Sequence, residues 1–318
     1  MRGIACLVLL IAAPVAAQTA TEGVYRLGEL ASTRDSLDIT RAETLPELAR
    51  LGYREGRNVF LDERVADAAA IHTVAREMVL NKPDAIIAIG AEAIGAIASA
   101  TKTVPIITYG ADPVRLGLAL SLARPGGNVT GLVILAEELD AKRLDLLTET
   151  APGARPVAAL LHRSLSYRLQ IEQSLRSSAA KRGIELLTFG ADGPEEYSAA
   201  FAAMRTAGAQ ALVVTGSPTF NRDSGLLARR ALEMRLPVIC EWAENAQSGC
   251  LLGYGPNRRQ MRHRLAHYVA RIFQGAAPAD LPIETPTQFE LAINLRTART
   301  LGIEIPASLL ARADWVIE

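Results

Sequence analysis

The sequence has no excess of charge of either sign. Its 318 residues include 34 lysines and arginines and 34 aspartates and glutamates, so the formal net charge is zero. Because nucleic-acid-binding domains usually carry a strongly basic face, this balance gives no support for a nucleic-acid partner. Only 5% of the residues are aromatic and 49% are hydrophobic, which is typical of a soluble α/β protein. The length suits roughly two domains.

Motifs for metal binding and for common kinds of catalysis are also missing. Of four scattered histidines, only His263 and His267 share a predicted helix face. No cysteine or acidic partner accompanies them in the sequence, so we expect a solvated face and no metal site. The chain has neither a Gly-x-Ser-x-Gly elbow after a strand nor a phosphate-binding Gly-x4-Gly-Lys-Ser/Thr loop. We therefore expect a protein that is not an enzyme and that needs no cofactor.

The hydrophobic run near the N-terminus is too short to span a bilayer. It covers Ile4–Ala13 and follows one basic residue, Arg2, whereas a membrane-spanning helix needs about 20 apolar residues. Val15 and Ala17 then provide the small −3 and −1 positions of a signal-peptidase site. Residues 1–17 are thus predicted to be a signal peptide, cleaved near Ala17, and the mature protein is predicted to be periplasmic. The alternative is a buried N-terminal helix of a cytosolic protein.

Few cysteines remain once Cys6 has left with the signal peptide. Cys240 and Cys250 lie at the end of one predicted strand and the start of the next. Export would place them in an oxidising compartment, but a disulfide requires Cα atoms within about 7 Å of each other. The sequence leaves both a disulfide and two buried free thiols open.

Strand and helix patterns alternate along the whole chain. The continuous apolar run Ala85–Ile89 is typical of a strand that is buried on both faces. Repeated strand–helix units predict parallel sheets with right-handed crossovers. The break at Pro125–Asn128 combines a fixed φ with two permissive glycines, and a new strand follows from Val129. The sequence therefore predicts two doubly wound α/β units.

Several segments, in one order over most of the chain, match a family pattern. They are Leu51–Asn58, Asp112–Val114, Leu122–Gly131, Gly253–Asn257, Pro278–Pro282, Thr287–Leu291, Ile293–Leu295, Ile305–Pro306 and Ser308–Asp314. Long motifs in a fixed order are far more specific than a single glycine pattern. In these segments the chain resembles the ABC-transporter substrate-binding proteins that have the type I periplasmic-binding-protein fold, in the branch whose studied members bind aromatic amino acids.

The resemblance implies an architecture and a function. It implies two parallel-sheet lobes joined by three crossings, with residues 22–127 and 255–287 in the first lobe and 128–254 and 288–318 in the second. It also implies an exported monomer that captures a small polar or zwitterionic solute, such as an amino acid, in a cleft that closes by hinge motion. The protein would deliver this solute to an ABC permease of the inner membrane.

Candidate site residues follow from where ligands bind in such sheets, at the carboxyl ends of the strands. Helix N-termini there would suit a ligand carboxylate, and Asp112 would pair with a ligand ammonium or cap its own turn. Aromatic residues, including Tyr167 and Phe220, would stack on the solute or pack on their own lobe. The predicted ligand-binding residues are Ser32, Thr33, Ala91, Glu92, Tyr109, Asp112, Ser164, Ser217, Thr219, Trp242 and Glu244.

Three loops differ from the family pattern, namely those at His162–Ser164, Ser217-Pro218 and Ala243-Glu244. The solute is therefore not fixed by the resemblance. Two other functions remain as alternatives: a periplasmic sensor subunit of a signalling system, and an exported α/β hydrolase or amidase.

Overall fold

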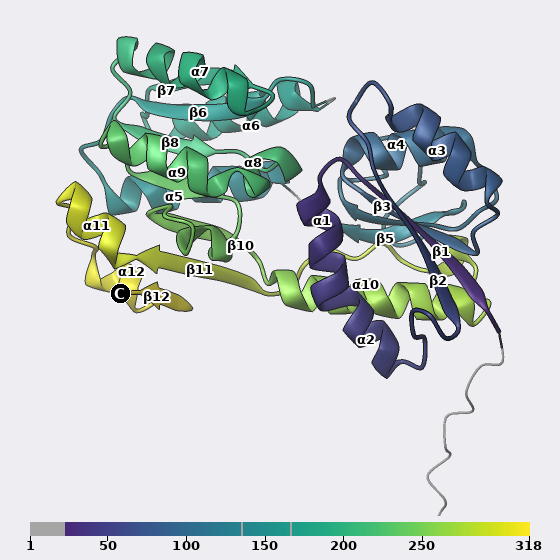
Figure 1. Cartoon of the computed structure of the whole chain (residues 1–318). Helices are drawn as coiled ribbons and strands as arrows, with labels where there is room; N and C mark the ends of the chain where they lie inside the picture. The colour runs from purple at the N-terminus through teal and green to yellow at the C-terminus, as the bar shows by residue number, and fades with distance from the viewer. Residues whose placement is uncertain (1–22, 135, 166) are drawn as a thin grey trace, which may run out of the picture.

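The chain folds into two α/β lobes that lie side by side (Figure 1). The structure is a computed structural model that describes residues 23–134, 136–165 and 167–318. The predicted signal peptide, residues 1–17, lies outside the described residues. Among the helices in these ranges, none is long and apolar enough to cross a membrane.

The sheet of the first lobe has five parallel strands in the order β2-β1-β3-β4-β5. All five residues of β3 are buried, as expected of a central strand with helices on both faces. The strands are β1 (Tyr25–Ala31), β2 (Val59–Val65), β3 (Ala85–Ile89), β4 (Ile106–Gly110) and β5 (Val129–Val133).

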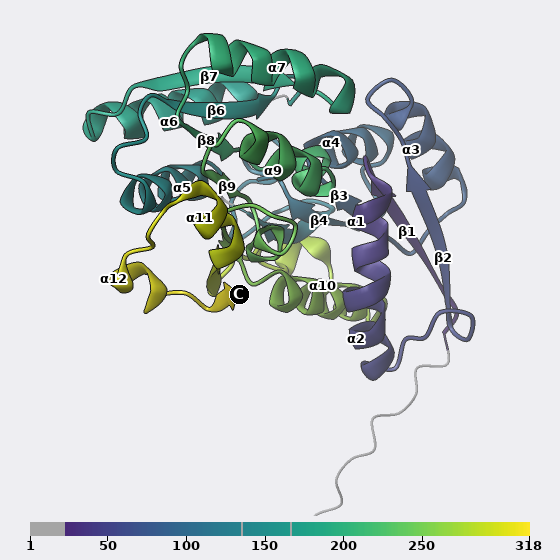
Figure 2. The same cartoon turned by 60° about the vertical axis from the view of Figure 1, so that its left-hand side comes forward.

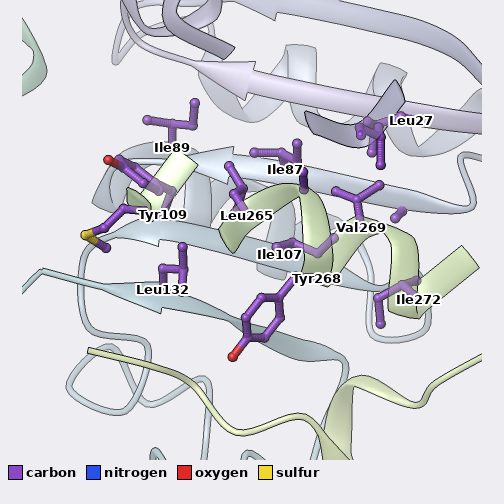
Figure 3. Packing of buried hydrophobic residues seen from close by; sticks show 14 of the residues in the cluster. Leu27, Ile87, Ile89, Ile107, Tyr109, Leu132, Leu265, Tyr268, Val269 and Ile272 are labelled. Carbon is purple, nitrogen blue, oxygen red and sulfur yellow. The ribbon is translucent and has the colours of Figure 1, made fainter. Parts of the chain in front are cut away.

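Helices cover both faces of this sheet. One face carries a long, segmented N-terminal helix and α10, whose Leu265, Val269 and Ile272 point at the strands (Figure 3). The other face carries α3 and α4. The helical segments are α1 (Arg34–Ile39), the π-helical turn η1 (Thr40–Thr44), α2 (Leu45–Arg50), α3 (Ile71–Leu80), α4 (Ala91–Ala100), α10 (Arg258–Phe273) and the 3-10 turn η3 (Pro278–Asp280).

The strand after the Pro-Gly-Gly break belongs to the first lobe, which corrects the predicted boundary after residue 127. Strand β5 pairs with β4 along its whole length, and Thr130 Oγ1 donates a hydrogen bond of 2.7 Å to the carbonyl oxygen of Leu281. Gly131 has φ +132°, and a Cβ there would collide with the backbone of Thr108. The Pro-Gly-Gly segment is thus a loop within one lobe, and the chain leaves this lobe after Ile134.

The sheet of the second lobe has seven strands in the order β12-β11-β10-β9-β8-β6-β7. Its pairs are parallel except for β10 with β11, which is antiparallel. The strands are β6 (Val157–His162), β7 (Leu186–Ala191), β8 (Ala211–Val214), β9 (Val238–Cys240), β10 (Leu252–Pro256), β11 (Phe289–Asn294) and β12 (Trp315–Ile317). The sequence patterns did not predict β12.

Helices again cover both faces of the sheet. Helices α5, α6, α11 and α12 contribute to one apolar cluster and α7, α8 and α9 to another, and Figure 2 shows α11 and α12 beside the C-terminus. Asp223 separates two of these helices, α8 and α9. The helices are α5 (Ala136–Thr150), α6 (Arg168–Lys181), α7 (Pro194–Thr206), α8 (Pro218–Arg222), α9 (Ser224–Glu233), the 3-10 turn η2 (Ala243–Ala246), α11 (Leu295–Leu301) and α12 (Ala307–Leu310).

Three passages connect the lobes, as the resemblance implied. They lie between β5 and α5, between β10 and α10, and between η3 and β11. Backbone bonds join them: Val133 N–H donates to Glu284 O at 2.9 Å, and Asn257 N–H donates to Gln288 O at 2.9 Å. The passages therefore run next to one another and form a hinge.

Cys240 and Cys250 form a disulfide, with an Sγ–Sγ distance of 1.99 Å and a Cα–Cα distance of 6.3 Å. Both side chains are buried. The sequence had left this pairing open. The bond ties the end of β9 to the segment that leads into β10, and it closes a loop that carries Glu241 and Trp242.

Candidate functional site

A cavity of about 420 Å³ lies between the lobes, which is within the usual size range of small-molecule sites. We call it the interlobe cavity. It lies at the carboxyl ends of β3, β4, β8 and β9, where ligands bind in parallel sheets. Its lining residues are Ser36, Ile39, Ile89, Gly90, Tyr109, Gly110, Ala111, Asp112, Arg115, Leu116, Ile134, Glu138, Tyr167, Gln170, Gly216, Ser217, Pro218, Asn221, Glu241, Trp242, Arg258 and Arg262.

Of the eleven predicted site residues, four line this cavity, namely Tyr109, Asp112, Ser217 and Trp242. Ser32, Thr33, Ala91, Glu92, Ser164, Thr219 and Glu244 do not. Several of these have structural partners instead. Thr33 accepts a 3.4 Å hydrogen bond from Ser36 N–H at the start of α1, and Ser164 bonds to Asp192 through its N–H and its hydroxyl, both at 2.9 Å.

Two of the lining residues use their side chains for local capping. Asp112 Oδ1 accepts a 2.8 Å hydrogen bond from the backbone N–H of Val114, and Ser217 Oγ accepts one of 3.0 Å from Phe220 N–H. These are the roles that turn and N-cap residues have in many proteins. Asp112 therefore already has a donor for one carboxylate oxygen.

Arg262 lies on the first-lobe side of the cavity and was missed by the sequence analysis. Its side chain is 3% exposed, and its guanidinium carbon lies 4.1 Å from the centroid of the Tyr109 ring. Nη1 donates a 2.9 Å hydrogen bond to Thr40 Oγ1. Nε has no hydrogen-bond partner among the described residues. Arg262 is thus a buried cation that contacts a π face and a hydroxyl, without an ion-pair partner in the part of the chain that the structure describes.

A buried carboxyl group lies behind Arg262. Thr40 donates a 2.6 Å hydrogen bond to Glu29 Oε1. Burial raises the pKa of Glu29 to about 8, although the Thr40 hydrogen bond and the charge of Arg262 oppose this shift. At neutral pH this carboxyl is largely protonated, so it does not neutralise Arg262.

Among the residues that line the cavity, Tyr109 is a second one with a buried polar atom, its hydroxyl, that has no hydrogen-bond partner in the described part of the chain. The ring is 4% exposed. Burial raises the Tyr109 pKa; the charges of Arg262 and Arg258 oppose this, and those of Glu241 and Glu244 add to it. Charges from both lobes therefore act on this one hydroxyl at the cavity wall.

Glu241 provides a carboxyl group on the second-lobe side. It directly follows the disulfide residue Cys240 at the end of β9. Burial raises its pKa and Asp140 adds to the rise, whereas Arg143, a hydrogen bond with the Trp242 side chain and Arg258 lower it. A cationic ligand group beside this carboxylate would further stabilise its charged form.

A fully buried ion pair lies below Glu241. Arg143 Nη1 donates to Asp140 Oδ1 at 2.6 Å, and both side chains are completely buried. The same guanidinium donates to the backbone carbonyls of Tyr254 at 2.8 Å and of Glu241 at 2.9 Å. These bonds join α5, β10 and the loop after β9, and fix the backbone of Glu241 against the hinge.

The lobes are in contact across the mouth of the cavity. Asn221 Nδ2 on α8 donates a 3.0 Å hydrogen bond to Asp35 Oδ2 on α1. Gly90 lies opposite Pro218, whose Cγ would be 3.6 Å from a Cβ placed on the glycine. The structure therefore has the closed arrangement of the two lobes.

The lining combines three chemistries. Ile39, Ile89, Leu116 and Ile134 form apolar walls, Tyr109, Tyr167 and Trp242 add aromatic rings, and three arginines and three carboxylates add charges of both signs. Among the described residues, no group of three His, Cys, Asp or Glu side chains is placed to hold a metal ion. The cavity suits a small molecule with an apolar body and opposite charges.

Comparisons with known proteins agree with this geometry. Residues 32–317 match the family described as ABC transporter substrate binding protein. A tyrosine-binding protein of Clostridioides difficile is 27% identical over 274 residues, which is 85% of this chain and 78% of that protein. A conserved domain protein of Vibrio cholerae aligns with a TM-score of 0.86 and 28% identity, over 93% of this chain and 100% of the other.

A further solved structure is that of an ABC domain from Streptococcus pneumoniae in complex with L-Trp. It aligns with a TM-score of 0.85 and 25% identity, over 93% of this chain and 100% of the other. Together with the two lobes and the three passages, these similarities confirm the predicted fold class.

Proposed function

The chain belongs to the family of ABC transporter substrate-binding proteins, and from this premise we propose that its solute is an amino acid with an apolar or aromatic side chain. It takes up the solute in the interlobe cavity, closes over it and presents the closed form to a membrane permease. The observation that carries this proposal is the lining of the cavity, where apolar and aromatic walls surround charges of both signs. A free amino acid has the same combination of groups.

The names of two similar proteins support the same solute class. One is described as a tyrosine-binding protein and another was solved with L-Trp. Both solutes are zwitterions with a flat ring, for which Tyr109, Tyr167 and Trp242 offer stacking partners. Of the predicted site residues, we retain Tyr109, Asp112, Ser217 and Trp242 as part of the lining.

The rest of the proposal concerns the setting. We expect the protein to be exported through its N-terminal signal, to act in the periplasm as a monomer, and to deliver the solute to an ABC permease of the inner membrane. Its activity is binding, without chemical change of the solute.

A thermal-shift screen of purified, ligand-stripped protein tests this proposal. The protein is unfolded in guanidinium chloride, dialysed and refolded with its disulfide intact, and then melted with each of the twenty L-amino acids. A ligand at 100 times its Kd adds about 2.7 kcal/mol of apparent stability, which is several degrees in Tm. We expect such a shift for one or a few apolar or aromatic amino acids and none for glucose.

A flat response across the amino acids would contradict the proposed solute. Incubating the protein with amino-acid amides and esters, and measuring the released acid, tests the hydrolase alternative, and turnover there would contradict pure binding.

A further inference from the structure

Among the polar groups that line the cavity, Arg262 is the one that most lacks charge and hydrogen-bond partners within the described part of the chain. A buried charge is costly unless it is paired and hydrogen-bonded. Arg262 has a hydroxyl and a ring as neighbours, and its Nε has no hydrogen-bond partner among the described residues. Glu29, the carboxyl behind Thr40, is largely protonated at neutral pH. An anionic group in the cavity would supply the missing charge and the missing acceptor.

The hydroxyl of Tyr109 adds a second donor beside Arg262. It is buried, belongs to a residue that lines the cavity, and has no partner in the described part of the chain. A carboxylate has two oxygens, so one group can accept from the guanidinium and from the phenol together. Arg262 is on α10 and Tyr109 at the end of β4, so both donors belong to the first lobe.

Glu241 is the matching acceptor on the second lobe. Its carboxyl group lines the cavity after β9, and the charges of Glu241 and Arg262 both act on the Tyr109 hydroxyl. Asp112, the ammonium partner expected from the sequence, follows β4 and so belongs to the same lobe as Arg262 and Tyr109, and one of its oxygens accepts from Val114 N–H. Glu241 has a hydrogen bond with the Trp242 side chain but lies on the opposite lobe. It is therefore the carboxylate placed across the cavity from the two donors.

We propose that the amino acid spans the cavity with its carboxylate on Arg262 and Tyr109 of the first lobe and its ammonium on Glu241 of the second lobe. This inference rests on the proposed function and specifies how the solute is oriented. A zwitterion held in this way connects the two lobes through its own charges, whereas a molecule with one charge connects to one lobe only. The cavity thus selects for zwitterions because only they stabilise the closed arrangement from both sides.

The test measures how tightly three related solutes bind to the wild type and to two variants. The solutes are the amino acid with the largest thermal shift, its primary amide, which lacks the carboxylate, and its deaminated acid, which lacks the ammonium. For L-tyrosine these are L-tyrosinamide and 3-(4-hydroxyphenyl)propanoate. Their Kd values are measured by titration calorimetry with the wild type, Arg262→Gln and Glu241→Gln.

Each variant is expected to stop distinguishing the amino acid from one of its two analogues and to keep distinguishing it from the other. Arg262→Gln should raise the Kd of the amino acid roughly 30-fold or more, which is the effect of removing one partner of a buried charge pair. It should change the Kd of the amide less than about threefold. Glu241→Gln should raise the Kd of the amino acid by a similar factor and leave the Kd of the deaminated acid nearly unchanged. Arg264→Gln is the matched control on α10, since Arg264 is half-exposed and pairs with Glu284 outside the cavity.

Other outcomes would overturn the inference. If Arg262→Gln weakens the binding of the amino acid and of its amide by the same factor, Arg262 does not bind the carboxylate. If Asp112→Asn removes the preference for an ammonium group while Glu241→Gln keeps it, the cation lies at Asp112. Binding of no amino acid at all would instead contradict the proposed function.

A crystal structure of the wild type with the amino acid provides a second measurement that depends on no variant's folding. The expected result is a ligand carboxylate oxygen within 3.2 Å, an ordinary hydrogen-bond distance, of an Arg262 nitrogen. A carboxylate bound only at a helix N-terminus would overturn the inference.

Discussion

The backbone N–H of Trp242 and the carboxylate of Asp35 lie at the two ends of one chain of hydrogen bonds that crosses the cleft. Trp242 N–H donates to Asn245 Oδ1 at 2.8 Å, Asn245 Nδ2 donates to Asn221 Oδ1 at 3.2 Å, and Asn221 Nδ2 donates to Asp35 Oδ2 at 3.0 Å. A lining residue of the second lobe is thereby linked to α1 of the first lobe, but only when the lobes are closed.

The first prediction concerns this chain of hydrogen bonds. Asn221→Ala removes the two bonds that Asn221 makes, with Asn245 and with Asp35, and a hydrogen bond to a charged group contributes about 1.5–3 kcal/mol. Since the bond to Asp35 exists only in the closed arrangement, the variant should bind its solute roughly 10-fold more weakly. Calorimetry gives the Kd, and small-angle scattering should show a larger radius of gyration without solute.

The control for this prediction is Asp38→Asn. Asp38 is exposed on the same helix as Asp35 and does not line the cavity. An equal loss of affinity in both variants would show that the charge of α1, and not the bond across the cleft, affects binding.

The second prediction concerns the disulfide. Replacing Cys240 and Cys250 together by alanine should lower the free energy of unfolding by roughly 2–3 kcal/mol, because the short loop is no longer closed in the unfolded chain. Affinity should fall as well, because this loop carries Glu241 and Trp242. Urea unfolding measures the first effect. Wild-type protein unfolded with and without a reductant should differ by the same amount, and equal midpoints would contradict the prediction.

The third prediction concerns the edge of the first sheet. Gly131→Ala should destabilise the protein by more than about 3 kcal/mol or prevent folding, since its Cβ would overlap the backbone of Thr108 at a φ of +132°. Gly127→Ala is the matched control, because nothing lies within 4 Å of a Cβ there. Circular dichroism melts compare the two. Similar Tm values would mean that β5 does not pack against β4 as described.

The fourth prediction concerns pH and Glu29. Its pKa is about 8 in the fold against 4.5 ordinarily, so the folded state holds a proton that the unfolded chain releases. The stabilising contribution of this proton is complete below about pH 4.5 and is lost as the pH rises towards 8. Glu29→Gln stays neutral, so its stability relative to the wild type should increase over that interval, by a few kcal/mol at most. Urea unfolding from pH 5 to 9 measures the difference; a constant difference would contradict the prediction.

Local patterns were sufficient for the elements whose signal lies in neighbouring residues. The apolar run Ala85–Ile89 is a fully buried strand, as predicted. The capping alternative for Asp112 also follows from a spacing of two residues, to the N–H of Val114. Such features depend on backbone geometry, which a short segment largely determines.

Contacts between distant segments could not be predicted in this way. Arg262 meets Tyr109 and Thr40 only because α10 returns to the first lobe after the chain has formed most of the second lobe. Likewise, Val129–Val133 was assigned to the wrong lobe, because its place is set by pairing with β4 and by Leu281, far along the chain. The histidine pair on α10 was expected to have no acidic partner, yet His263 and His267 lie near Glu47 of α2.

Arg143 has a consequence for how sensing of the solute and motion of the lobes are related. Its guanidinium donates to the carbonyl of Glu241, which lines the interlobe cavity, and to that of Tyr254 on β10, three residues before Asn257 in the passage into α10. Arg143 thus connects the backbone of a cavity-lining residue directly with the strand that leads into the hinge. A change of this one side chain is expected to affect the position of Glu241 and the motion of the lobes together.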